Sequence, residues 1–212
     1  MKLKLAIVAV VLVSLLPAAA QVSHLTPFSG DVQITSEHGG RGGGDMNGKI
    51  YVAREHMRLD MESGPRGGAS VITNFPTKTT DILMPDRHMY MEVSADQQAM
   101  ARRPGMAPQI KPFADPNNPC ANDTAKTCKK IGVEQINGRT CDHWEITDKE
   151  GQVTNAWIDQ KLHFPIKEIT PRSTWQVTNI QEGDQPASLF VVPAGYQKMD
   201  LGQMMQGMGG PQ

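Results

Sequence analysis

The sequence predicts a mostly β protein built on a strongly curved antiparallel sheet, a half-barrel with one or two short helices plugging its concave side. The chain has 212 residues with 20 Gly and 15 Pro, a density of helix breakers that argues against long helices. Apolar and polar residues alternate along most of it, and turn residues separate the alternating runs. A flat sheet of about ten strands would leave its apolar face uncovered, so we expect the sheet to curl.

Residues 1–20 have the pattern of a signal peptide. Lys2 and Lys4 precede an apolar run over residues 5–16, and small residues ending at Ala20 follow it. The run is shorter than the about 20 residues of a membrane-spanning helix. No Cys follows Ala20 directly, so a lipid anchor has no acceptor there. We therefore expect cleavage after Ala20, no stable membrane anchor, and a periplasmic or secreted protein.

The remaining chain is expected to form one β domain over residues 21–196, followed by a Met- and Gly-rich tail at 197–212. The first strand is predicted at 28–36, because Phe28, Val32 and Ile34 are separated by even steps. Two segments, 38–48 and 95–118, are expected to be flexible loops because they are rich in Gly or Pro and lack periodicity. The second loop is predicted to hold a short helix over 96–103.

Two hairpin units follow the first loop. The segment 48–61 is predicted to turn at Arg54 and Glu55, which sets Ile50 opposite Leu59 and Val52 opposite Met57. Further strands are expected at 70–74, 79–84 and 87–93. In the last two of these strands, one face is expected to carry the apolar residues Ile82, Met84, Met89, Met91 and Val93.

The Asn137-Gly138 pair gives the strongest hairpin signal, because both residues accept the positive φ angles of a type I′ turn. This turn pairs 129–136 with 139–147 and places Ile131 opposite Trp144 and Cys128 opposite Thr147. A further turn at 148–151 is expected to set Val153 opposite Ile146, with Trp157 on the side of Trp144. The two indoles would then mark the buried face. Strands at 166–170, 175–180 and 188–192 complete the predicted meander.

The three cysteines favour one disulfide in an exported protein. In the predicted hairpin register Cys128 and Cys141 are about 20 Å apart along the ladder, which excludes that pair. Cys120–Cys128 closes a short polar loop and is the preferred bridge. Cys120–Cys141 remains the alternative, because the segment before Cys128 is flexible.

Composition and motifs exclude several functions. Lys plus Arg is 21 against 22 Asp plus Glu, for a net charge of −1, so there is no basic field for nucleic acid. Gly48-Lys49 ends a sequence similar to a phosphate-binding loop, but Ile50 replaces the required Ser or Thr. The sequence also lacks the common hydrolase and metalloprotease motifs. We expect no enzyme, no cofactor and no catalytic residue.

Cys141, His143 and Glu145 alternate along one strand, and Glu134 lies across from Cys141. A metal or thiol site is conceivable there. However, this face is opposite the one that carries Trp144, so we expect it to be a solvated polar face and no metal site.

Several segments together resemble a known family. They are 48–61, 81–93, 138–145 with the sequence Gly-Arg-Thr-Cys-Asp-His-Trp-Glu, 157–159 and 189–196. They resemble an exported bacterial family catalogued as domain of unknown function number 4412, whose fold is similar to that of the periplasmic lipoprotein carriers LolA and LolB. In those carriers the half-barrel shelters acyl chains. The resemblance therefore implies, by analogy, a lipid-type or lipoprotein-type ligand.

We thus predict an exported, monomeric, non-enzymatic binding protein whose partner is an apolar small molecule or a lipid or lipoprotein segment. Three alternatives remain. The first is a copper-binding protein using His88 with the neighbouring Met89 and Met91 and the tail methionines Met204, Met205 and Met208. The others are a structural envelope protein with a plugged interior and a hydrolase using Cys141 and His143. The predicted ligand-binding residues of the concave face are Ile50, Val52, Met57, Leu59, Ile82, Met84, Met89, Met91, Val93, Trp144 and Trp157.

Overall fold

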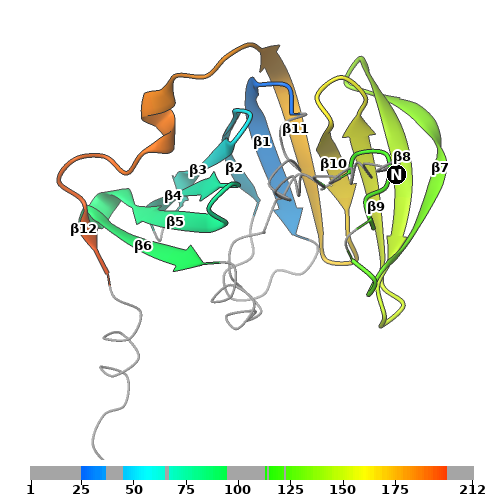
Figure 1. Cartoon of the computed structure of the whole chain (residues 1–212), viewed down its shortest axis with the longest axis horizontal. Helices are drawn as coiled ribbons and strands as arrows, with labels where there is room; N and C mark the ends of the chain where they lie inside the picture. Colours follow the sequence, from blue (N-terminus) through cyan, green and yellow to red (C-terminus); the bar gives the residue numbers. More distant parts are fainter. Residues whose placement is uncertain are drawn as a thin grey trace, which may run out of the picture.

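The computed structural model describes residues 25–36, 45–64, 67–94, 113, 115–121 and 123–199. They form one open sheet of 12 strands in the order β12-β6-β5-β4-β3-β2-β1-β11-β10-β9-β8-β7 (Figure 1). Helical structure in these ranges is limited to the 3-10 segments η1 (Pro85–Arg87) and η2 (Ala187–Phe190). The predicted mostly β, curved antiparallel sheet is confirmed, whereas no helix that plugs its concave side is found among the described residues. The predicted signal peptide, the helix over 96–103 and residues 200–212 of the tail lie outside the described residues.

All neighbouring strands pair antiparallel except β12, which pairs parallel with β6. No helix in the described ranges is long and apolar enough to cross a membrane. The strands are β1 Phe28–Ser36, β2 Met46–Val52, β3 His56–Gly64, β4 Gly67–Asn74, β5 Thr79–Met84, β6 Met89–Ser94, β7 Thr127–Ile136, β8 Arg139–Thr147, β9 Val153–Asp159, β10 Phe164–Ile169, β11 Ser173–Glu182 and β12 Gln197–Lys198.

The β2–β3 hairpin has the predicted register, with Ile50 opposite Leu59 and Val52 opposite Met57. Strand β2 begins at Met46, so the predicted loop over 38–48 extends too far toward β2. Gly48 explains why this Gly-rich end forms a strand. A Cβ atom at Gly48 would lie 2.2 Å from the backbone oxygen of Asp60, so only glycine allows the two strands to approach this closely.

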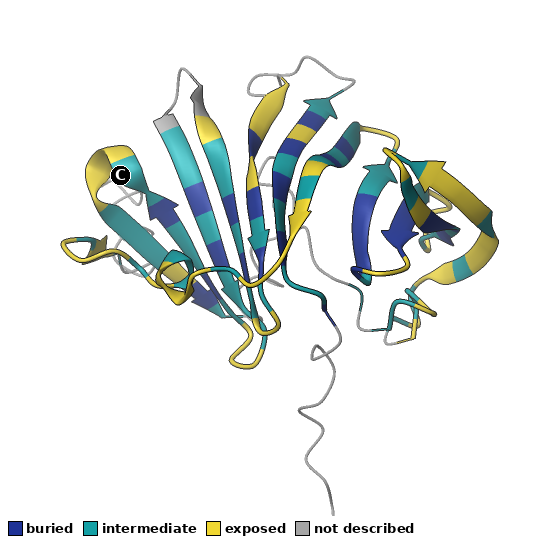
Figure 2. Cartoon of the chain, turned by 90° about the horizontal axis from the view of Figure 1, so that it is seen from above, coloured by how far each residue is buried: buried dark blue, intermediate teal, exposed yellow. Residues whose placement is uncertain are grey.

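One face of the sheet, which we call the inner face, carries the alternating apolar residues of β1 and β2. Residues directly opposite each other share a face, so the inner face can be followed from strand to strand through the register. Buried and more exposed bands alternate along these strands in Figure 2. The main core cluster includes Phe28, Val32, Ile34, Ile50, Val52, Met57, Leu59, Trp175 and Val177 of this face.

Strands β7–β10 form a leaf that is only partly joined to the rest of the sheet. β10 pairs with β11 through Lys167–Ile169 alone, so Phe164 lies beyond this pairing. Phe164 instead packs edge-on against Phe28, with ring centroids 5.3 Å apart. The turn of the β7–β8 hairpin returns to β11, where Asn137 Nδ2 donates to the Val177 oxygen at 3.3 Å. The leaf thus packs against the main core at the middle of the sheet.

The predicted β7–β8 register is correct near the turn and wrong beyond a bulge. Glu134 is opposite Cys141, but the register shifts between Lys130 and Gly132, so Trp144 faces Lys130 and not Ile131. The extra residue places Cys128 opposite Ile146 and not Thr147.

The bulge has a consequence for the cysteines. It turns the Cys128 side chain to the face of Ile146, where Cys120 also packs. The two cysteines form the preferred disulfide, with Cα atoms 5.8 Å apart. Cys141 is free and buried.

The two indoles of β8 and β9 lie on opposite faces, so the prediction that they share one buried face is wrong. Trp144 is opposite Ala156, whereas Trp157 is opposite His143. The register differs by one residue from the predicted one, because the Asp148 N–H donates to the Gln152 oxygen and closes the turn there. Thr147 and Val153 become the first strand pair after this turn.

The segment after β11 is not the predicted strand over 188–192. Pro186 and Pro193 flank it and supply no backbone donors, and the chain forms η2 in place of a strand. The segment crosses β3 on the face opposite the inner face: Arg58 Nη1 donates to the Leu189 oxygen at 3.0 Å. The chain then reaches β12 beside β6 (Figure 1).

Candidate functional site

The register places ten of the eleven predicted ligand-binding residues on the inner face, and Trp157 on the opposite face. The ten differ in exposure. Buried members are Ile50, Val52, Met57, Leu59, Val93 and Trp144, whereas Ile82, Met84, Met89 and Met91 are partly exposed. The inner face is therefore closed by packing at β1–β3 and more open at β4–β6.

The open part forms a continuous apolar surface, which we call the methionine patch. Cross-strand pairs define it: Val71 lies opposite Ile82, Ile82 opposite Met91, and Met84 opposite Met89. Met61 and Val71 belong to it and were not predicted. Met61 could have been found from its alternation with Met57 and Leu59 in β3, and Val71 from its pairing with Leu59. The patch consists of Met61, Val71, Ile82, Met84, Met89 and Met91, all partly exposed. Flexible thioethers of this kind adapt to ligands of varied shape.

The opposite face of β8 and β9 is more buried than predicted. Cys141 is 0% exposed, and the His143 ring stacks on Trp157 with centroids 4.4 Å apart. Cys141 and Trp157 belong to the same core cluster as Phe28 and Val177, so the leaf turns this face of β8 and β9 toward the main core. The prediction of a solvated face is therefore wrong for these residues.

Hydrogen bonds occupy the polar groups beside this stack. Glu134 Oε2 accepts from Trp157 Nε1 at 2.8 Å, and Glu134 Oε1 lies 2.7 Å from His143 Nδ1. These contacts lower the pKa of the Glu134 carboxyl, the bond from Trp157 having the largest effect. His143 Nε2 lies 2.8 Å from Asn155 Oδ1. Both ring nitrogens of His143 are thus engaged by side chains.

Cys141 and His143 do not form a nucleophile–base pair. Cys141 Sγ contacts the Arg139 oxygen at 3.5 Å, and burial raises the pKa of its thiol to about 12. A thiol of that pKa is a poor nucleophile at neutral pH. Within the described ranges no three His, Cys, Asp or Glu side chains are grouped as metal ligands.

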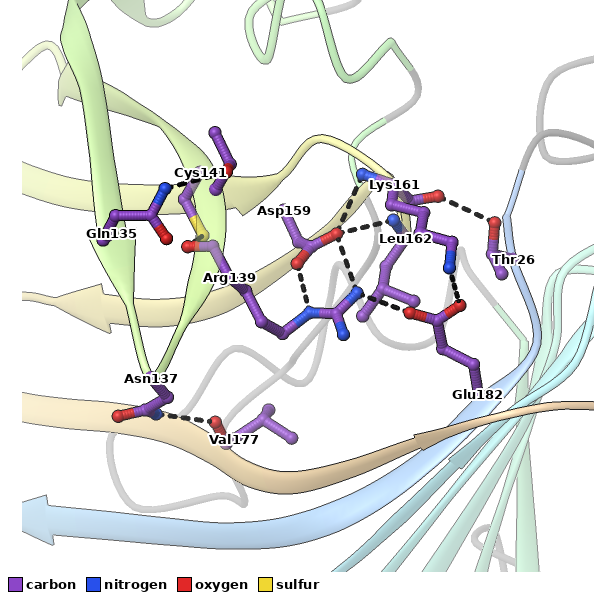
Figure 3. Close-up of polar contacts among 11 residues, drawn as sticks. Thr26, Gln135, Asn137, Arg139, Cys141, Asp159, Lys161, Leu162, Val177 and Glu182 are labelled. Carbon is purple, nitrogen blue, oxygen red and sulfur yellow. Dashed lines mark hydrogen bonds and ion pairs between the residues drawn. The ribbon is translucent and has the colours of Figure 1, made fainter.

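A charged junction joins the leaf to β11 (Figure 3). Arg139 pairs with Asp159 and, at 2.9 Å, with Glu182, and Lys161 pairs with Glu182 at 2.5 Å. These residues line a polar surface hollow of about 580 Å³. Because each of these charges already has a partner, the junction serves to fix the leaf and offers no free charge for a ligand.

The copper alternative stays a prediction. His88 lies in the turn before β6, with its ring centroid 5.7 Å from that of Tyr196. The tail methionines that the hypothesis also uses lie outside the described residues.

A family model matches residues 28–163, and its description is "Domain of unknown function (DUF4412)". The chain belongs to this family, as its sequence resemblance implied. No curated protein matches the chain in sequence.

Solved structures share the fold at low sequence identity. An uncharacterized conserved protein from Thermus thermophilus matches with a TM-score of 0.53 and 10% identity, over 85% of this chain and 94% of that one. A chain of the Pseudomonas aeruginosa MucA/MucB complex matches with a TM-score of 0.50 and 15% identity, over 81% of this chain and 57% of that one. A LolA superfamily protein from Nitrosomonas europaea matches with a TM-score of 0.42 and 11% identity, over 82% of this chain and 94% of that one. At these identities the first two likenesses show the fold alone, and the third carries no argument.

Proposed function

We propose that this protein is an exported, non-enzymatic binding protein that holds an apolar ligand, a lipid or the acyl chain of a lipoprotein, against the inner face of its sheet. The methionine patch carries this proposal. Its six side chains are apolar, adjacent and partly exposed, although they belong to the face that forms the core elsewhere. A surface of this kind gains free energy when a ligand covers it, about 25 cal/mol per Å² of apolar area.

The chemistry of the other polar groups is consistent with binding rather than catalysis. The charged junction is internally paired, and burial raises the pKa of the Cys141 thiol to about 12. The fold is also compatible with a binding role, since MucB, whose structure shares it, is found in a complex with MucA.

A fluorescence titration with a dansyl-labelled fatty acid tests this function. We expect saturable binding with a blue-shifted emission by the mature chain. Met91→Glu places a charge in the methionine patch and should weaken binding by about tenfold or more, because the carboxylate loses hydration when the acyl chain binds. Met91 is partly exposed, so the variant should still fold.

Val133→Glu is the matched control, since Val133 is 57% exposed on β7 and lies outside the patch. It should bind the probe as the unmodified chain does. An unmodified protein that does not bind the probe, or two variants with equal affinity, would contradict the proposal.

A further inference from the structure

Thioether side chains gather on the part of the inner face that is open. Of the methionines in the described ranges, Met61, Met84, Met89 and Met91 belong to the methionine patch, and all four are partly exposed. The closed part of the same face, at β1, β2 and β11, is built mainly from Phe, Val, Ile and Trp side chains. An apolar residue type that peroxides oxidise therefore occupies the positions that solvent reaches.

The four thioethers are neighbours in the sheet. Met84 of β5 lies directly opposite Met89 of β6, and Met91 follows two residues later on the same face of β6. Met61 of β3 lies opposite Ala69 of β4, whose small side chain separates it from β5. Opposed residues on one face have Cβ atoms about 5 Å apart. A chemical change at these four sulfurs would thus alter one continuous surface.

The three cysteines of the chain are poor targets for the same oxidant. Cys120 and Cys128 already form the disulfide. Cys141 is 0% exposed, and burial raises the pKa of its thiol to about 12, so the reactive thiolate is scarce at neutral pH. Met57 is shielded as well, because it is only 3% exposed on the inner face of β3. An oxidant that approaches the inner face from solvent therefore reaches the thioethers of the methionine patch first.

We propose that the methionine patch is a site of reversible oxidation by peroxides, and that conversion of its thioethers to sulfoxides releases the bound apolar ligand. This inference rests on the proposed function and adds a regulation to the same site. The lone pair of the Met sulfur forms a bond to one oxygen of hydrogen peroxide while the O–O bond breaks. The leaving hydroxide takes the proton of the transferred oxygen and becomes water. The sulfur loses the two electrons that the peroxide gains, so hydrogen peroxide is the one co-reactant.

A sulfoxide makes the methionine patch polar. In the free protein, water hydrates the sulfoxide oxygen, because the four positions are partly exposed. An acyl chain that covers the patch removes this water and supplies no hydrogen-bond donor in return, which costs free energy. Val71 and Ile82, the other members of the patch, have no side-chain donor either. Oxidation should therefore weaken binding and leave the fold intact, and methionine sulfoxide reductases should reverse the effect.

The experiment treats the protein with hydrogen peroxide, locates sulfoxides by tandem mass spectrometry and measures the Kd of the dansyl-labelled fatty acid. We expect the methionines of the patch to gain oxygen well before Met57. Once they are oxidised, the Kd should rise about tenfold or more, while the urea unfolding midpoint stays unchanged. Treatment with methionine sulfoxide reductases A and B should return the Kd to its starting value.

A quadruple variant tests whether the sulfur chemistry causes the loss of binding. It keeps an apolar side chain at each position but cannot form a sulfoxide, so peroxide should change its Kd by less than about twofold. Its substitutions are Met61→Leu, Met84→Leu, Met89→Leu and Met91→Leu. Met46→Leu is the matched control, since Met46 is 36% exposed at the start of β2 and lies outside the methionine patch. The control should lose affinity on oxidation as the unmodified chain does.

Equal affinity of the oxidised and the untreated protein, or a peroxide-induced loss of affinity in the quadruple variant, would overturn the inference and leave the proposed function intact. If the quadruple variant does not bind the probe at all, reductase treatment of the oxidised unmodified chain decides: recovered binding supports the inference, and persistent loss overturns it. If the untreated, unmodified chain binds no acyl probe, the proposed function fails and the inference with it.

Discussion

Single residues determine how closely the strands of this sheet approach and which groups ionise within it. Gly48 permits the contact between β2 and β3 at the Asp60 backbone, and no other residue type fits there without a shift of the backbone. Glu168 is an acidic group placed where burial favours its neutral form. Both positions are exceptions to the local pattern of alternating strand residues, and both therefore have measurable consequences.

Gly48→Ala should lower the free energy of unfolding by about 1–3 kcal/mol, because the added methyl group would overlap the Asp60 carbonyl. The matched control is Gly132→Ala in β7, where an added Cβ meets nothing within 4 Å. That variant should stay within about 0.5 kcal/mol of the unmodified chain. Urea unfolding measures both values, and equal effects in the two variants would contradict the close contact.

Glu168 should make stability fall as pH rises. Burial raises the pKa of Glu168 from its ordinary value of 4.5 to about 7 in the folded chain, so the folded state binds more protons between these pH values. The contribution of Glu168 to the free energy of unfolding is therefore greatest below about pH 4.5, and it is lost as the pH rises through 7. Glu168→Gln removes this titrating group. The free energy of unfolding of the variant, minus that of the unmodified chain, should therefore increase between pH 5 and pH 8 by at most about 3 kcal/mol. Thermal unfolding at the two pH values tests it; a pH-independent difference would show that Glu168 is not buried as described.

At the scale of elements, the predictable parts are those fixed by local alternation and by turn residues. The β2–β3 hairpin and the Asn137-Gly138 turn belong to this class. The bulge at Ile131 could not be predicted, because one extra residue in a strand leaves the sequence pattern on either side unchanged. The segment of η2 was misassigned for a different reason: its apolar run resembles a strand, and only the flanking prolines oppose that interpretation.

The disulfide ties the segment before β7 to the leaf, so its loss should destabilise the protein. A closed loop of this length corresponds to about 2–3 kcal/mol through the entropy of the unfolded chain. We expect the double variant Cys120→Ala/Cys128→Ala to show this decrease in urea unfolding. The same double variant should also expose Trp144, with a red shift of its emission, because both cysteines pack on its cluster. Unchanged stability and emission would contradict a covering role for the segment.

At the scale of the whole molecule, one face of a single sheet serves both as core and as candidate binding surface. The sequence predicted which residues share this face, except Trp157, since the alternation specifies faces strand by strand. It could not predict that the leaf of β7–β10 covers the face at β1–β3 and leaves the methionine patch partly exposed. That division depends on contacts between distant segments, such as Phe28 with Phe164 and Arg139 with Glu182.

The most direct test of the account is photocrosslinking of the protein with a diazirine-labelled fatty acid, with the modified residues located by tandem mass spectrometry. The account predicts labelling concentrated on inner-face residues of β3–β6, above all the methionine patch, and loss of labelling when excess unlabelled oleate competes. Labelling that does not saturate, or that falls on the opposite face of the same strands at residues such as Asp81 and Glu92, would contradict it.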